Sequence, residues 1–243
     1  MGVRRCRGEH MRGWVIPPPR EPVKGEEEFR RERKEKVASL TRKGYLRSER
    51  IREALLKVPR EDFIPRLYRD YAYEEVPLPL PGEEATISCP HSYPLFYEPL
   101  GLDRGHRFLE VGLGSGYGTA LAREIVGEKG LVLAMEIDPV TLAFAENNLR
   151  RTGYHDVVLV QGDGGLGHRE GAPYDRICMT AACDQIPPPL LDQLEAGGRL
   201  IAPIEEGGVQ NLVVLEKGAK GLERKVICQV LYISLRGRYG KGG

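Results

Sequence analysis

Short apolar runs alternate with longer amphipathic stretches along the chain from residue 107 onward. The apolar runs have the length of strands, whereas the stretches between them space their apolar residues three or four apart or open with proline, as helices do. The predicted strands are 107–112, 131–137, 156–163, 175–180 and 199–204, and the predicted helices are 117–126, 139–151 and the segment after Pro187–Pro189. This alternation is typical of βαβ units and predicts an α/β fold with a parallel sheet wound on both faces.

The last two apolar runs, 211–217 and 225–235, have no helical stretch between them. Strands joined by a short connection pair antiparallel, because a parallel pair needs a long crossover. The sheet is therefore predicted to be mostly parallel and to end in an antiparallel C-terminal pair.

The N-terminal part has a different character. Residues 1–25 show no apolar period and carry several prolines, which favours a flexible or extended arm. Residues 26–36 mix charges of both signs as a solvated helix does, and residues 40–58 predict one or two amphipathic helices. Eight prolines between Pro59 and Pro99 predict a long irregular segment, and such segments usually bind something.

Composition excludes several classes of protein. The chain has 243 residues and a net charge of +1, which argues against gripping nucleic acid, and no apolar run is long enough to span a membrane. The N-terminus lacks the apolar core of a secretion signal, so we expect a cytoplasmic protein. Five cysteines without a CxxC pair predict neither a disulfide framework nor a metal site.

A glycine-rich loop follows the first predicted strand. It has the form Glu110-x-Gly112-x-Gly114-x-Gly116 and lies where ligands bind in a parallel sheet. Tyr117 occupies the position that a dinucleotide fingerprint gives to its last glycine, and no GK[ST] ending of a phosphate loop is present. The acidic residue would repel a pyrophosphate but suits a sulfonium cofactor, so the loop favours S-adenosylmethionine.

Two further carboxylates end the next two predicted strands. Glu136 can accept hydrogen bonds from both ribose hydroxyls of an adenosine, and Asp163, beside Gly164, can reach the exocyclic amine of adenine. Together with Glu110 they form a constellation that a plain tight turn does not explain.

The sequence resembles the protein-L-isoaspartate O-methyltransferase family from about Leu40 to Leu235. The glycine loop is generic to methyltransferases, but the block ATISCPH before the first strand is much more specific. The stretches that carry the resemblance are VPREDFIP (58–65), ATISCPH (85–91), LEVGLGSGY (109–117), GDG (162–164), APYD (172–175) and LLDQLEAGGRLIAPI (190–204).

This resemblance implies a Rossmann-like methyltransferase sheet with an altered order of its last two strands and an N-terminal helical addition. It divides the chain into an extension (1–39), a segment of helices and acceptor-binding loop (40–105) and the cofactor-binding domain (106–243). The family's active-site serine corresponds to Ser88, with Thr86, Ile87 and His91 in the same substrate-binding loop.

The activity implied is methylation of the free α-carboxylate of L-isoaspartyl residues in damaged proteins, by a monomer acting on peptides and proteins. A carboxylate is ionised near neutral pH and needs no general base, so catalysis would consist of alignment and exclusion of water. Two segments depart from the family: Ile233-Ser234-Leu235 replaces the usual Val-Pro-Leu, and Cys183-Asp184 follows the fourth strand.

Three alternatives remain. A methyltransferase of this fold could act on another peptide, a small molecule or RNA. A non-catalytic cofactor-binding protein would not be expected to keep every carboxylate and glycine named above. A Cys89–His91 nucleophilic pair is conceivable, but the intervening proline is expected to hold the two side chains apart.

Overall fold

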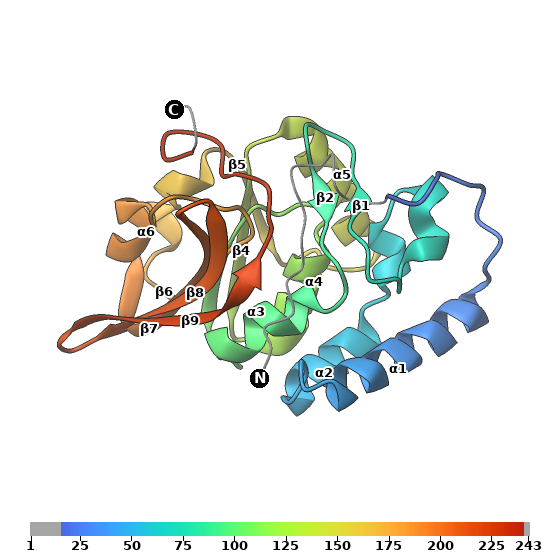
Figure 1. The fold of residues 1–243 in the computed structure, drawn as a ribbon, viewed down its shortest axis with the longest axis horizontal. Coiled ribbons are helices and arrows are strands. Elements are labelled where there is room, and N and C mark those ends of the chain that lie inside the picture. Colours follow the sequence, from blue (N-terminus) through green and yellow to red (C-terminus); the bar gives the residue numbers. More distant parts are fainter. Residues whose placement is uncertain (1–15, 241–243) are drawn as a thin grey trace.

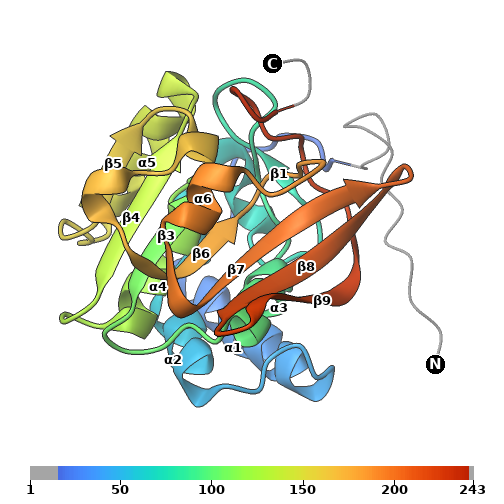
Figure 2. The same ribbon diagram turned by 90° about the vertical axis from the view of Figure 1, so that its left-hand side faces the viewer.

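The computed structural model describes residues 16–240, which form one seven-stranded sheet with helices against both faces (Figures 1 and 2). The strand order is β5-β4-β3-β6-β7-β8-β9. These strands are β3 (Arg107–Val111), β4 (Leu131–Glu136), β5 (Val158–Gln161), β6 (Tyr174–Met179), β7 (Leu194–Glu206), β8 (Val209–Gly218) and β9 (Gly221–Val230). The helices are α1 (Glu26–Arg42), α2 (Glu49–Lys57), α3 (Ser92–Leu100), α4 (Tyr117–Val126), α5 (Pro139–Arg151) and α6 (Pro188–Asp192).

The sheet has the predicted mixture of directions. Strands β5, β4, β3, β6 and β7 pair parallel, whereas β8 pairs antiparallel with both β7 and β9. The predicted last strand was too long, because β9 ends at Val230. The chain beyond it returns to the sheet at Ala182, whose N–H donates to the carbonyl of Ile233 over 2.8 Å. This return brings residues 231–236 to the carboxyl ends of the parallel strands.

Each face of the sheet packs a separate apolar core. Consecutive residues of a strand point to opposite faces, so Phe108 belongs to the core that includes residues of α1–α5, while its neighbour Leu109 belongs to the core that includes α6. Both side chains are fully buried. The alternation explains why the sheet is covered on both faces, with the larger layer of helices on one of them.

The N-terminal helices differ from the sequence-based expectation. The solvated helix predicted over 26–36 is part of α1, which continues to Arg42 and buries Phe29, Val37 and Leu40. It packs beside α2 at one end of the molecule (Figure 1). Ser48 caps α2, its hydroxyl accepting from the N–H of Ile51.

Residues 16–25 form no helix or strand and are held against the short 3₁₀ helix Arg66–Tyr71. The N–H of Arg20 donates to the carbonyl of Leu67 over 2.9 Å, and the N–H of Val23 donates to the carboxylate of Asp70 over 3.0 Å. This part of the predicted arm is therefore docked, and the rest of it, residues 1–15, lies outside the described residues.

The proline-rich segment contains more regular structure than expected. It holds a two-stranded pairing of β1 (Leu78–Pro79) with β2 (Thr86–Ile87), and α3 forms despite Pro94 and Pro99. Pro94 is the third residue of α3, where a backbone N–H has no partner within the helix, and Pro99 falls in the last turn. Within residues 16–240 no helix is long and apolar enough to cross a membrane.

Candidate active site

A cavity of about 740 Å³ opens at the carboxyl ends of β3, β4 and β6. The glycine loop and the end of β4 line one side of it, and the segment from Thr86 to His91 lines the other. Nine of the residues predicted from the sequence line this cavity: Glu110, Gly112, Gly114, Glu136, Gly164, Thr86, Ile87, Ser88 and His91. Gly116 and Asp163 do not.

The glycine loop is shaped by positive φ angles and by close packing. Gly112 has φ +93°, and a Cβ there would overlap Oγ1 of Thr180 at the end of β6. That hydroxyl donates to the carbonyl of Gly112 over 2.8 Å, so the loop is tied to the neighbouring strand. Gly116 has φ +84° and caps α4 against Leu149, which gives it a structural position beneath the loop.

Glu110 lines the cavity and is buried, with 3% of the residue's surface exposed. The pKa of Glu110 is raised to about 8, mainly by burial; the Thr119 hydroxyl opposes this rise and the negative charge of Glu136 adds to it. The Thr119 hydroxyl donates to Oε2 over 2.5 Å. A buried carboxylate with one hydrogen-bond donor is well suited to a cationic ligand.

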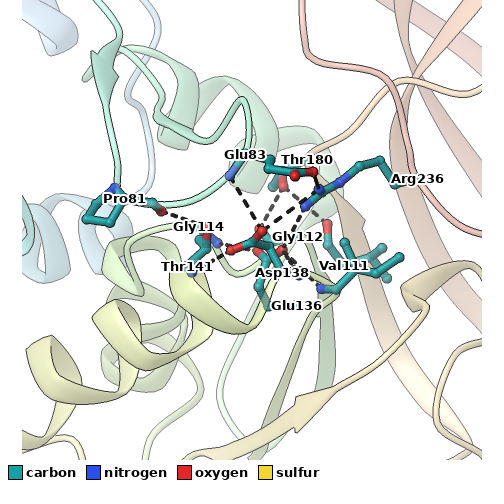
Figure 3. A network of polar contacts seen from close by, with 11 residues as sticks. Pro81, Glu83, Val111, Gly112, Gly114, Glu136, Asp138, Thr141, Thr180 and Arg236 are labelled. Atoms are coloured by element: carbon teal, nitrogen blue, oxygen red, sulfur yellow. Dashed lines mark hydrogen bonds and ion pairs between the residues drawn. The ribbon is translucent and has the colours of Figure 1, made fainter.

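The carboxylate of Glu136, at the end of β4, accepts hydrogen bonds from several backbone N–H groups (Figure 3). Its Oε2 accepts from the N–H of Gly114 over 3.1 Å, and its Oε1 accepts from the N–H groups of Ile137 and Asp138 over 3.0 and 3.1 Å. Arg236, from the returning C-terminal segment, places Nη2 3.9 Å from the same Oε1. This arrangement fixes the carboxylate at the cavity edge where a ribose diol could approach it.

Asp163 is bonded to backbone and does not line the cavity, and its contact with an adenine amine stays a prediction. Its Oδ1 accepts from the N–H of Gly165 over 2.9 Å and its Oδ2 accepts from the N–H of Arg238 over 2.8 Å. Both oxygens therefore hold backbone, one in the 3₁₀ turn Gly164–Leu166 and one in the C-terminal segment. Of the GDG motif, Gly164 is the residue that reaches the cavity.

The opposite wall is built from β2 and the residues that follow it. The carbonyl of Ser88 accepts from Nη2 of Arg60 over 2.7 Å, and the hydroxyls of Ser92 and Ser88 both lie near the Tyr232 hydroxyl. Burial raises the pKa of Tyr232 above its usual range, so it stays a neutral phenol. Arg60 and Tyr232 were both missed by the sequence analysis, although Arg60 belongs to the VPREDFIP motif.

Arg60 is a buried guanidinium, 1% exposed. Its Nε donates to the carbonyl of Ala72 over 2.6 Å, and its carbon centre lies 5.6 and 5.3 Å from the ring centres of Tyr93 and Tyr117. Among residues 16–240 its Nη1 finds no hydrogen-bond partner. The positive charge thus lies directly behind the Ser88 loop and stabilises its backbone position.

His91 and Cys89 lie on the same wall. Nδ1 of His91 is 2.6 Å from Oε2 of Glu75. Sγ of Cys89 lies within 4.8 Å of a ring nitrogen of His91, so the two side chains are on the same side of Pro90, and their action as a nucleophilic pair stays an alternative. Ligand atoms of Glu75, Cys89 and His91 lie within 4.8 Å of one another, because the chain turns at Pro90 into the start of α3.

The two segments that depart from the family pattern have different positions. Ile233, Ser234 and Leu235 line the cavity, and Ser234 forms a parallel bridge with Ala182. Cys183 instead belongs to the core on the α6 side of the sheet and is 2% exposed. Only the first departure lies against the cavity.

Comparison with known proteins agrees with this geometry. A sequence model described as Protein-L-isoaspartate(D-aspartate) O-methyltransferase matches residues 31–240, so the match begins earlier than the Leu40 inferred above. A protein-L-isoaspartate O-methyltransferase of Hyperthermus butylicus is 43% identical, covering 90% of this chain and 94% of the relative. One from Methanopyrus kandleri is 44% identical, covering 81% and 87%.

Solved structures give the same result. A protein-L-isoaspartate O-methyltransferase superposes with a TM-score of 0.79 at 35% identity, covering 86% of this chain and 67% of that one. A beta-aspartate methyltransferase from Plasmodium falciparum, in complex with S-adenosyl-L-homocysteine, superposes with a TM-score of 0.75 at 25% identity, covering 84% and 98%. The chain therefore belongs to the protein-L-isoaspartate(D-aspartate) O-methyltransferase family.

Proposed function

We propose that this protein transfers the methyl group of S-adenosylmethionine to the free α-carboxylate of L-isoaspartyl residues in damaged proteins. The observation that carries the proposal is that two walls face one cavity. The glycine loop with Glu110 and Glu136 forms the first, or cofactor, wall, and the Thr86–His91 segment forms the second, or acceptor, wall. Membership of the family supplies the acceptor.

The residues of the first wall suit the cofactor. Glu110 is a buried carboxylate whose raised pKa would return toward its ordinary value beside a cation, so it would hold the cationic methionine end. Glu136 would accept from the ribose hydroxyls, and Gly112, Gly114 and Gly164 would allow close approach of backbone. Asp163 would act through the Gly164–Leu166 turn that it caps. When bound, the cofactor supplies an electrophilic methyl group on sulfur.

The second wall would hold the acceptor. The Thr86 and Ser88 hydroxyls and the backbone around Ile87 offer donors to a carboxylate, and Tyr232 would orient the Ser88 hydroxyl. An ionised carboxylate is already nucleophilic, so these residues need to align one oxygen with the methyl carbon and exclude water. The product is a methyl ester, which favours ring closure to a succinimide and partial return to normal aspartate.

We also propose a cellular location, an oligomeric state and a class of partner for this protein. We place the protein in the cytoplasm as a monomer that acts on peptides and proteins and does not require nucleic acid. The near-zero net charge supports the last point.

The experiment that tests this function is transfer of labelled methyl to an isoaspartyl peptide, followed by mild alkali. A carboxyl methyl ester releases its label as methanol, whereas an N-methyl group keeps it. We expect label that alkali releases. Label that is stable to alkali would favour another acceptor, and so would the absence of label in a protein that binds S-adenosylhomocysteine. The departure of residues 233–235 from the family pattern would then explain the different acceptor.

A further inference from the structure

Three side chains of different chemistry meet at the acceptor wall of the cavity. One carboxylate oxygen of Glu75, Sγ of Cys89 and one ring nitrogen of His91 all lie within 4.8 Å of one another. All three residues line the cavity. Within residues 16–240 this is the only group of three or more His, Cys, Asp or Glu side chains with such spacing.

The ligand set selects a class of cation. Thiolate, imidazole and carboxylate together suit Zn²⁺ and Co²⁺, whereas Mg²⁺ and Ca²⁺ prefer oxygen alone. Zinc–ligand distances place the ligand atoms of a tetrahedral site about 3.3–3.8 Å apart. The three ligand atoms lie within 4.8 Å of one another, and Nδ1 of His91 is 2.6 Å from Oε2 of Glu75. Small side-chain rotations would therefore open this pair and bring all three atoms to the separations that a metal ion requires.

The surrounding contacts already orient the three side chains. Cys89 and His91 flank Pro90, whose ring fixes its own φ, and His91 is the N-cap residue of α3. The ring of His91 packs on that of Tyr45, with centroids 5.4 Å apart. Lys36 donates to Oε1 of Glu75 over 2.9 Å, which leaves Oε2 facing His91. Supporting contacts of this kind orient ligands in metal sites.

We propose that Glu75, Cys89 and His91 bind a thiophilic divalent cation of the Zn²⁺ type, and that the bound cation inhibits methyl transfer. Binding would form three metal–ligand bonds and release the thiol proton of Cys89 to solvent. Because the group lines the cavity, its fourth coordination position is open to an entering acceptor. A carboxylate oxygen that donates a lone pair to the cation is a weaker nucleophile toward a methyl group.

The absence of a CxxC pair led the sequence analysis to predict no metal. The structure supplies the third ligand from Glu75, which is 14 residues before Cys89 and whose position no short motif encodes. Cation binding stands independently of the proposed function, whereas the inhibition rests on it.

Cobalt is the probe for binding. Titration of the full chain with Co²⁺ should give a near-ultraviolet thiolate-to-cobalt charge-transfer band and strong visible bands of a four-coordinate ion, saturating at one equivalent. Cys89→Ala should abolish the thiolate band, and His91→Ala should weaken Co²⁺ binding by at least about tenfold. Cys228→Ala is the matched control, since Cys228 also lines the cavity but lies outside the group, and it should keep the band.

Zinc then tests inhibition, with each protein's rate compared with its own metal-free rate. Zn²⁺ should displace cobalt and inhibit methyl transfer by the wild type and Cys228→Ala, while Cys89→Ala should resist. No thiolate band in the wild type, or a band that survives in Cys89→Ala, would overturn the site. Cobalt binding without inhibition by zinc would overturn the proposed inhibition. The cobalt spectra show whether the cation binds even if isoaspartyl peptides prove not to be substrates.

Discussion

Nη2 of Arg236 lies 3.9 Å from Oε1 of Glu136, so a residue of the returning C-terminal segment faces the proposed ribose-binding carboxylate (Figure 3). Arg236 also places Nη1 3.3 Å from Glu83 and 4.0 Å from Asp138. It thereby bridges the loop before β2 and the start of α5. The C-terminal segment and the acceptor-side loop are thus joined across the edge of the cofactor wall.

The first prediction is that Glu136 contributes far more than Arg236 to cofactor affinity. Glu136→Ala should weaken S-adenosylhomocysteine binding about tenfold or more, because a charged acceptor is lost. Arg236→Ala should change the affinity by less than about fivefold, because its side chain is 37% exposed and such ion pairs contribute little. Calorimetric titration of both variants checks this, with circular dichroism to confirm folding. Unchanged affinity in Glu136→Ala would remove Glu136 from the site.

A second prediction concerns the close contact between Gly112 and Thr180. Gly112→Ala should weaken S-adenosylhomocysteine binding by at least about tenfold, since the new methyl displaces the Thr180 hydroxyl and shifts the loop. Gly153→Ala is the matched control: Gly153 has φ +90° but open space around it. Both variants should lose about 1–3 kcal/mol of unfolding free energy through backbone strain. Equal loss of ligand affinity in both would contradict the contact.

The third prediction uses the protonation of Glu110. In the cofactor-free protein burial raises the pKa of Glu110 to about 8, so below that pH the carboxyl is protonated and a cationic ligand must displace the proton. Affinity for S-adenosylmethionine should therefore rise up to about tenfold per pH unit as pH approaches 8, then level off. Glu110→Gln should bind more weakly and lose this rise. A flat profile in the wild type would show that Glu110 does not meet the cation.

The same group sets a pH dependence of stability. Between the usual carboxyl pKa of about 4.3 and the folded value of about 8, the folded protein binds more protons than the unfolded chain. The unfolding free energy should fall as pH rises through this window, and Glu110→Gln should remove that part of the slope. Urea unfolding of the cofactor-free proteins at pH 5, 6.5 and 8 measures it.

The fourth prediction concerns Ser88. Ser88→Ala should lower the rate of methyl transfer to an isoaspartyl peptide about a hundredfold through misalignment of the acceptor, and leave S-adenosylhomocysteine affinity nearly intact. Ser92→Ala, which removes the other hydroxyl near Tyr232, should retain most activity. Comparable losses in both variants would mean that the Tyr232 contact, and not a contact between Ser88 and the acceptor, governs the rate.

The cofactor wall was largely predictable because its residues are local in sequence. Glu110, Gly112 and Gly114 lie within five residues, and Glu136 ends a strand whose apolar run is unmistakable. Parallel strands bring their carboxyl ends to one edge of the sheet, so a motif at one strand end and a carboxylate at the next are brought together by topology alone.

The remaining parts depend on tertiary contacts that no local pattern encodes. The return of the chain after β9 places Tyr232 at Ser88 and Arg236 at Glu136, and it also engages Asp163 through the N–H of Arg238. The sequence predicted a strand there because apolar residues continue to Leu235. Periodicity could not reveal that these residues face a cavity instead of extending the sheet.

Competition between matched acceptors tests the central claim most directly. An isoaspartyl peptide and its aspartyl twin, present together at equal concentration with labelled S-adenosylmethionine, compete for one site, and mass spectrometry gives the ratio of their kcat/KM values. We predict a ratio of about a hundred or more in favour of the isoaspartyl peptide, because the aspartyl carboxylate lies one methylene out of line with the methyl group. Equal methylation of the two peptides would contradict assignment of this cavity to isoaspartyl repair.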